Sequence, residues 1–156
     1  MKKLHTLILT VALAISADAA VVRPAPDFFW QGAGGRLSKM RGQPVVLVLA
    51  KSPRSGAFKK QAKLLRELYQ QFAAKQVLFV AAFQETGGPR IPSDIPWIVA
   101  DNGAKIAADY GIRGSFAIAV IGKDGNLDML KTKITPPETV RAVLVSSFAV
   151  QAAERK

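Results

Sequence analysis

The chain has 156 residues and no cysteine, and its 22 lysine and arginine side chains outnumber its 11 aspartate and glutamate side chains to give a formal net charge of +11. Without cysteine it forms no disulfide and has no thiol nucleophile. The length suits one domain with one core, and the charge favours an acidic partner or surface through long-range attraction.

The first 19 residues have the pattern of a cleavable secretory signal peptide. Lys2 and Lys3 precede an apolar run at 7–15 that is shorter than a membrane span, and small residues follow at 17–19. We expect cleavage after Ala19, which divides the chain into a signal peptide at 1–19 and one domain at 20–156. The mature protein is then periplasmic or secreted and has no transmembrane span. A retained anchor is the alternative.

Cleavage there also removes His5, the only histidine. A mature chain with neither Cys nor His has no Cys nucleophile, no His general base, no Ser–His–Asp triad and no zinc site with N or S ligands. The aspartates at 101–103 and 124–126 follow turn patterns rather than those of a paired acid–base site or a calcium site. We therefore assign no catalytic residue, metal or cofactor, and whether the protein is an enzyme stays open.

The first half of the chain predicts two buried strands around an amphipathic helix. A proline-bounded lead-in at 23–26 and a short helical turn or loop at 37–43 precede the first strand at 44–50, where PVVLVLA is apolar throughout. The 3.6-residue period predicts a helix over 57–75, with an apolar face opposite its lysines. The second buried strand follows at 76–83.

The second half predicts a short helix, a hairpin and a last helix. After a loop at 84–96 come a short strand at 97–100, a helix at 102–110, a strand at 116–121, an Asp-Gly hairpin turn and a return strand at 127–133. The last helix is predicted to open with a capping box, with Thr135 as N-cap, Pro136 at the first helical position and Glu138 at the third. This order predicts an α/β fold, a mixed β-sheet flanked by helices on both faces.

Four local strings occur in a fixed order along the chain. They are APDF at 25–28, LSKMRGQPVV at 37–46, YGIRG at 110–114 and IGKDG at 121–125. In this order and spacing they resemble the thioredoxin-like superfamily, specifically its exported redoxin branch of alkyl hydroperoxide reductase/thiol-specific antioxidant and thiol–disulfide oxidoreductase relatives. The resemblance covers about 25–145 and implies a thioredoxin-like sheet flanked by helices.

The chain departs from that branch where the branch has its redox chemistry. The family's cysteines lie in the loop after the central strand, and the matching positions here are Pro53 and Gly56 or, with a slip of one residue, Ser52 and Ser55. The family's cis-proline is replaced by Phe116. Because a cis bond before a non-proline residue costs about 2.5–4 kcal/mol, we expect the Ser115–Phe116 bond to be trans. The resemblance therefore implies a redox-inactive domain.

The start of the 57–75 helix is the first candidate binding site. A helix N-terminus favours anions, and Ser52, Arg54 and Ser55 lie there. The resemblance implies that Arg113, Ser115 and Phe116 lie in the facing loop, so this cluster could hold a carboxylate or phosphate. The alternative is that the serines only cap the helix and the arginines are solvated.

The cationic face of the same helix is the second candidate. Lys59, Lys60, Lys63 and Arg66 could dock on an acidic protein, a small anion or an anionic envelope surface. The alternative is a solvated face opposite an apolar stripe. Nucleic acid is not expected, because export argues against it and no motif supports it.

The aromatic residues at 28–30, together with Trp97, are expected to pack in the core, with an exposed peptide-binding patch as the alternative.

We interpret the chain as a redox-inactive binding or adaptor module. The alternative is a thiol-independent redoxin-family enzyme whose chemistry the residues do not place, since serine without a histidine base is a poor nucleophile.

Overall fold

The structure, a computed structural model, describes residues 23–30, 34–85, 91 and 93–154. The predicted signal peptide at 1–19 lies outside these ranges. No helix in the described part of the chain combines the length and the apolar composition needed to cross a membrane.

Five strands form one mixed sheet in the order β5–β4–β3–β6–β7. They are β3 (Val45–Ala50), β4 (Leu78–Phe83), β5 (Ile98–Val99), β6 (Phe116–Ile121) and β7 (Leu127–Lys131). The central strand β3 pairs parallel with β4 and antiparallel with β6. The apolar run at 44–50 is therefore the middle of the sheet, as its unbroken hydrophobicity predicts.

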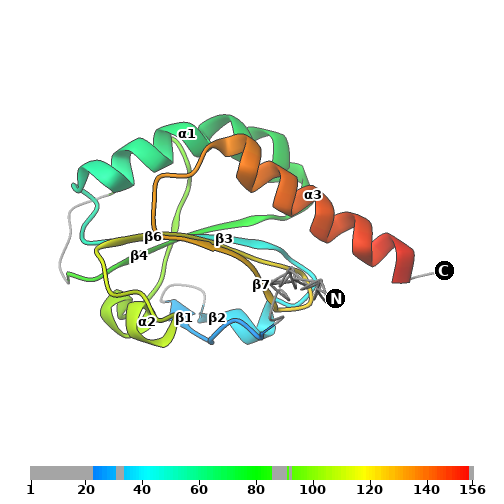
Figure 1. The fold of residues 1–156 in the computed structure, drawn as a ribbon, viewed down its shortest axis with the longest axis horizontal. Coiled ribbons are helices and arrows are strands. Elements are labelled where there is room, and N and C mark those ends of the chain that lie inside the picture. The colour runs from blue at the N-terminus through cyan, green and yellow to red at the C-terminus, as the bar shows by residue number, and fades with distance from the viewer. Residues whose placement is uncertain (1–22, 31–33, 86–90, 92, 155–156) are drawn as a thin grey trace, which may run out of the picture.

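Helices cover both faces of this sheet (Figure 1). The long helices α1 (Gly56–Phe72) and α3 (Pro137–Glu154) lie on one face. The short helix α2 (Gly103–Asp109) lies on the other, with the hairpin strands β1 (Phe29–Trp30) and β2 (Gly35–Arg36). Single turns of 3₁₀ helix occupy Leu37–Lys39 and Ala73–Lys75. The predicted α/β architecture is confirmed.

The alternation of side chains along β3 creates two cores. Val46, Val48 and Ala50 pack toward α1 and α3, whereas Val45, Leu47 and Leu49 pack toward α2 and the N-terminal hairpin. All six residues are at most 1% exposed. A strand buried on both faces needs apolar residues at every position, and this is why the segment shows no period of two.

One polar side chain of α1 is buried in the first of these cores. The Gln61 side chain is fully buried, its Nε2 donates to the carbonyl of Thr135 at 2.9 Å, and its Oε1 accepts from the Thr135 amide at 2.8 Å. This pair of hydrogen bonds joins α1 to the segment that leads into α3.

The start of α3 differs from the predicted capping box. The helix begins at Pro137, one residue later than predicted, and the hydroxyl of Thr135 donates to the carbonyl of Lys133 at 2.9 Å. The Thr135 backbone is already bonded to Gln61. A tertiary contact therefore sets the conformation of this residue, in place of the local capping pattern.

The N-terminal segment is hydrogen-bonded to the α2 side of the domain. The Tyr110 hydroxyl donates to the carbonyl of Pro26 at 2.9 Å. The carboxylate of Asp27 accepts from Nε of Arg36 at 2.6 Å and from the amide of Ser38 at 2.9 Å. Burial acts to raise the pKa of Asp27, but these hydrogen bonds outweigh it and lower that pKa.

Candidate functional site

The loop after β3 forms a tight turn that caps α1. Ser55 is the N-cap residue: its hydroxyl accepts from the amide of Phe58 at 3.4 Å and donates to the carbonyl of Ser52 at 2.9 Å. The amide of Ser55 donates to the same carbonyl at 3.1 Å. The Ser55 hydroxyl thus both accepts and donates a hydrogen bond within the turn. This arrangement favours the alternative in which the serine caps the helix, over the anion site.

Phe116, the first residue of β6, is part of the core. It is 8% exposed and pairs across the sheet with Ala50, the last residue of β3. The described chain has no cis peptide bond, so the Ser115–Phe116 bond is trans as expected. The preceding loop is held by Gln84, whose Nε2 donates to the carbonyl of Gly114 at 2.9 Å.

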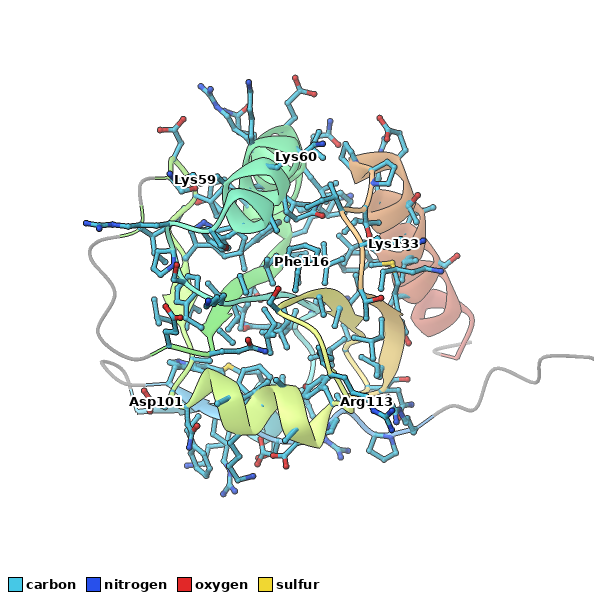
Figure 2. All side chains as sticks on the ribbon, turned by 60° about the vertical axis from the view of Figure 1, so that its left-hand side comes forward. Lys59, Lys60, Asp101, Arg113, Phe116 and Lys133 are labelled. Atoms are coloured by element: carbon cyan, nitrogen blue, oxygen red, sulfur yellow. The ribbon has the colours of Figure 1, made fainter. Side chains whose placement is uncertain are left out.

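Arg113 is not brought together with the cations of α1. Figure 2 shows Arg113 on the α2 side of the sheet, whereas Lys59 and Lys60 lie on the α1 side. Its neighbour Ile112 packs in the core on the α2 side, which is consistent with this placement. Ser115 is exposed in the same loop. The predicted cluster of Arg113 with Ser52, Arg54 and Ser55 at the start of α1 stays a prediction.

Three of the four cations predicted on α1 line one groove. Lys59, Lys63 and Arg66 form one wall of an open depression of about 540 Å³, and Ser93, Asp94 and Ile95 form the other. Residues spaced four and three apart lie on one side of a helix, so the wall follows from the sequence spacing. Ala62 and Ile95, both buried, give the depression an apolar lining. We call these seven residues the α1 groove.

Lys60 lies outside the α1 groove. Successive helical residues are rotated by about 100°, so Lys59 and Lys60 cannot share one face. Figure 2 shows the two side chains at separate positions on α1. The predicted cationic face therefore consists of two surfaces. Lys59, Lys63 and Arg66 line the groove, and Lys60 lies on a separate exposed part of the helix.

In the part of the chain that the structure describes, most cations near the start of α1 have no intramolecular counter-ion. Nζ of Lys51 lies 3.5 Å from a carboxylate oxygen of Glu85, and Nε of Arg66 lies 3.4 Å from a carboxylate oxygen of Asp94. Within the described ranges, Arg54, Lys59, Lys60 and Lys63 have no such ion pair. The positive charge of this region is therefore available to an external anion.

Asp94 is the charged member of the groove that sequence reasoning missed. It lies 28 positions after Arg66, in the segment predicted as a loop at 84–96, and no local pattern connects the two. Ser93 shapes this loop, because its hydroxyl accepts from the amide of Ile95 and from Nε1 of Trp97, each at 3.1 Å. Only the folded arrangement places Asp94 opposite Arg66.

Comparison with known proteins matches this arrangement to solved structures only, since no family model and no curated protein matches the chain. A Chlorobium tepidum protein described as the thiol:disulfide interchange protein DsbE aligns with a TM-score of 0.68 and 20% identity, over 81% of this chain and 96% of that one. Peroxidoxin BcpB from Mycobacterium tuberculosis aligns with a TM-score of 0.60 and 19% identity, over 83% and 96%. The thioredoxin domain of a thiol-disulfide oxidoreductase from Bacteroides vulgatus aligns with a TM-score of 0.64 and 14% identity, over 78% and 96%.

The fold is thioredoxin-like.

At these identities the similarity establishes the thioredoxin-like fold and nothing about activity. The sequence itself decides one point of chemistry. Because the chain has no cysteine, this thioredoxin-like domain cannot form a mixed disulfide or use a peroxidatic thiol.

The aromatic residues of the thioredoxin-like domain are mostly structural. Phe28 and Trp30 are buried on the α2 side, while Trp97 packs against Phe58 and Phe79 beneath α1. Phe29 is exposed, and the guanidinium of Arg36 lies 4.5 Å from its ring centroid. The described residues contain no group of three or more His, Cys, Asp or Glu side chains placed to hold a metal ion.

Proposed function

We propose that this protein is a redox-inactive binding or adaptor module that uses the α1 groove to hold an acidic partner. The observation that supports the proposal is the charge of the groove. Lys59 and Lys63 have no counter-ion in the described structure, and Arg66 shares only the exposed carboxylate of Asp94. A recess with three cations and one anion attracts carboxylates or other anions.

The structure at the start of α1 favours the α1 groove over an anion site at the N-terminus of that helix. The Ser55 hydroxyl is engaged in the capping turn and Arg113 lies on the α2 side of the sheet. The same engagement argues against the alternative of a thiol-independent enzyme with a serine nucleophile. That alternative predicts peroxide consumption or disulfide reduction by the purified protein that is lost on Ser52→Ala or Ser55→Ala, and we expect neither activity.

Export remains part of the proposal. Cleavage after Ala19 would place the acidic partner in the periplasm or outside the cell. The protein recovered from cells would then have the mass of a chain that begins at Ala20.

A binding titration tests the proposed function. We expect the purified protein to raise the fluorescence anisotropy of a fluorescein-labelled ten-residue glutamate peptide at low salt. The double variant Lys59→Glu/Lys63→Glu should weaken this binding about tenfold or more, because two attractions become repulsions. Added salt should weaken it as well.

The matched control is the double variant Lys131→Glu/Lys133→Glu. Both side chains are exposed, neither has an ion pair in the described structure, and Figure 2 shows Lys133 on the side of the molecule away from Lys59. This control changes the net charge by the same amount as the groove variant. Equal weakening by the two double variants would show attraction to net charge alone, and no binding by the wild type would contradict the proposal directly.

A further inference from the structure

The ion pair that crosses the α1 groove is exposed at both ends. Nε of Arg66 lies 3.4 Å from Oδ2 of Asp94, and the two side chains are 61% and 74% exposed. Exposed pairs of this kind contribute little to stability, so the pair opens readily when another carboxylate arrives. Asp94 is also the only carboxylate among the described residues that line the groove.

We propose that the groove receives an acidic peptide segment of a partner protein and that Asp94 competes with this segment for Arg66. The inference rests on the proposed function and extends it by naming the occupant and a residue that limits its affinity. In the free protein, the carboxylate of Asp94 occupies a position beside Arg66 that a partner carboxylate takes when the segment binds. Binding therefore exchanges one carboxylate for another at this guanidinium.

The shape of the groove favours a peptide chain as its occupant. Lys59, Lys63 and Arg66 span about 10 Å along α1 at 1.5 Å per residue. Acidic side chains on one face of an extended chain recur about every 7 Å, so two of them fit along this line of cations. Beside the cations, the groove is also lined by Ala62 and Ile95.

The same surface is poorly suited to a lipid bilayer. Basic helices that lie on membranes insert large apolar side chains beside their cations. The large apolar side chains that are exposed in the described structure are Phe29, Val99 and Val145, and none of them belongs to α1. We therefore assign the groove to a peptide, and vesicle binding that responds to Asp94→Asn when peptide binding does not would overturn the proposal.

Removal of the Asp94 charge tests the competition. With the labelled ten-residue glutamate peptide as probe, Asp94→Asn should bind about two- to fivefold more tightly than the wild type at low salt. Asp101→Asn is the matched control, because it is the same substitution with the same change in net charge, and Figure 2 shows Asp101 on the α2 side of the molecule, outside the groove. We expect its effect to stay below about twofold.

A double-mutant cycle shows whether the gain depends on Arg66. In an Arg66→Gln background, Asp94→Asn should give no gain, since the residue for which it competes is gone. A gain that persists without Arg66, or one equalled by Asp101→Asn, would overturn the competition even if Lys59→Glu/Lys63→Glu still abolished binding. In that case the proposed function would stand and only the role of Asp94 would fall.

Vesicles provide the last arm of the test. We expect phosphatidylglycerol vesicles to bind the wild type more weakly than the peptide does, with no gain from Asp94→Asn. If Asp94→Asn strengthened binding to vesicles and left the peptide affinity unchanged, the groove would be a lipid-docking surface and the peptide assignment would be wrong.

Discussion

At the residue scale, two buried polar side chains hold distant segments of the chain together. Gln61 satisfies both backbone polar groups of Thr135, 74 positions away in the sequence. Tyr110 satisfies the carbonyl of Pro26, 84 positions away. Buried backbone groups that lose their partners are costly, so each side chain should matter for stability out of proportion to its size.

Replacement of Gln61 by leucine should destabilise the protein by about 2–4 kcal/mol, because the amide and the carbonyl of Thr135 would lose their partners in a buried place. The measurement is the urea midpoint of unfolding. Gln70→Leu is the control, since Gln70 is exposed on the same helix and its replacement should change stability by less than about 0.5 kcal/mol. Equal midpoints for the two variants would show that the Gln61 bonds contribute nothing.

Tyr110 should give the protein a specific sensitivity to alkali. Burial, together with the charges of Asp27 and Asp109, raises the pKa of Tyr110 well above its usual value of 10.0. Below pH 10 the phenol is protonated in both the folded and the unfolded states, so it adds no pH dependence. Above pH 10 the unfolded state releases the proton while the folded state retains it, and stability falls by up to about 1.4 kcal/mol per pH unit.

Tyr110→Phe isolates this effect from the lysines that titrate in the same range. At pH 8 the variant should be about 1–2 kcal/mol less stable, because the Pro26 carbonyl loses its donor. Above pH 10 its stability should fall less steeply than that of the wild type. Parallel stability curves between pH 9 and pH 11.5 would mean that the phenol titrates normally in the folded protein.

At the scale of elements, local patterns predicted most of the fold and tertiary contacts account for the differences. The strands β3, β4 and β6 follow from apolar runs, and α1 follows from its 3.6-residue period. Both patterns can be recognised from residues that are close together in the sequence. The start of α3 differs from the prediction because the backbone of Thr135 is hydrogen-bonded to Gln61 of α1. The spacing of the cations on α1 could be recognised in the sequence. The position of Asp94 opposite Arg66 could not, because the loop that contains Asp94 meets α1 only in the folded chain.

The N-terminus of α1 offers a test that separates helix capping from anion binding. Ser55→Ala should lower stability by about 1 kcal/mol through loss of the cap. Ser52→Ala should leave stability nearly unchanged, because the turn uses the backbone carbonyl of Ser52 and the substitution leaves that carbonyl in place. Neither change should alter affinity for the glutamate peptide by more than about twofold. A clear loss of affinity in both variants would place the binding site at the helix start.

At the scale of the whole molecule, the protein joins a thioredoxin-like fold to a surface chemistry that needs no thiol. The fold positions α1 on one face of the sheet (Figure 1), and residues 93–95 line the groove beside it. A net charge of +11 attracts acidic molecules from a distance, but long-range attraction alone would not favour one place on the surface. The position at which an acidic ligand binds therefore distinguishes the α1 groove from attraction to net charge, which binding alone does not.

The most direct measurement is a titration of isotope-labelled protein with the ten-residue glutamate peptide, followed by the shifts of its backbone amide signals in NMR spectra. We predict that the largest shifts map to residues 59–66 of α1 and to residues 93–95, with small shifts around Lys131 and Lys133. Shifts spread evenly over the basic surface, or centred on Arg113 and on residues 52–55 at the start of α1, would contradict the account.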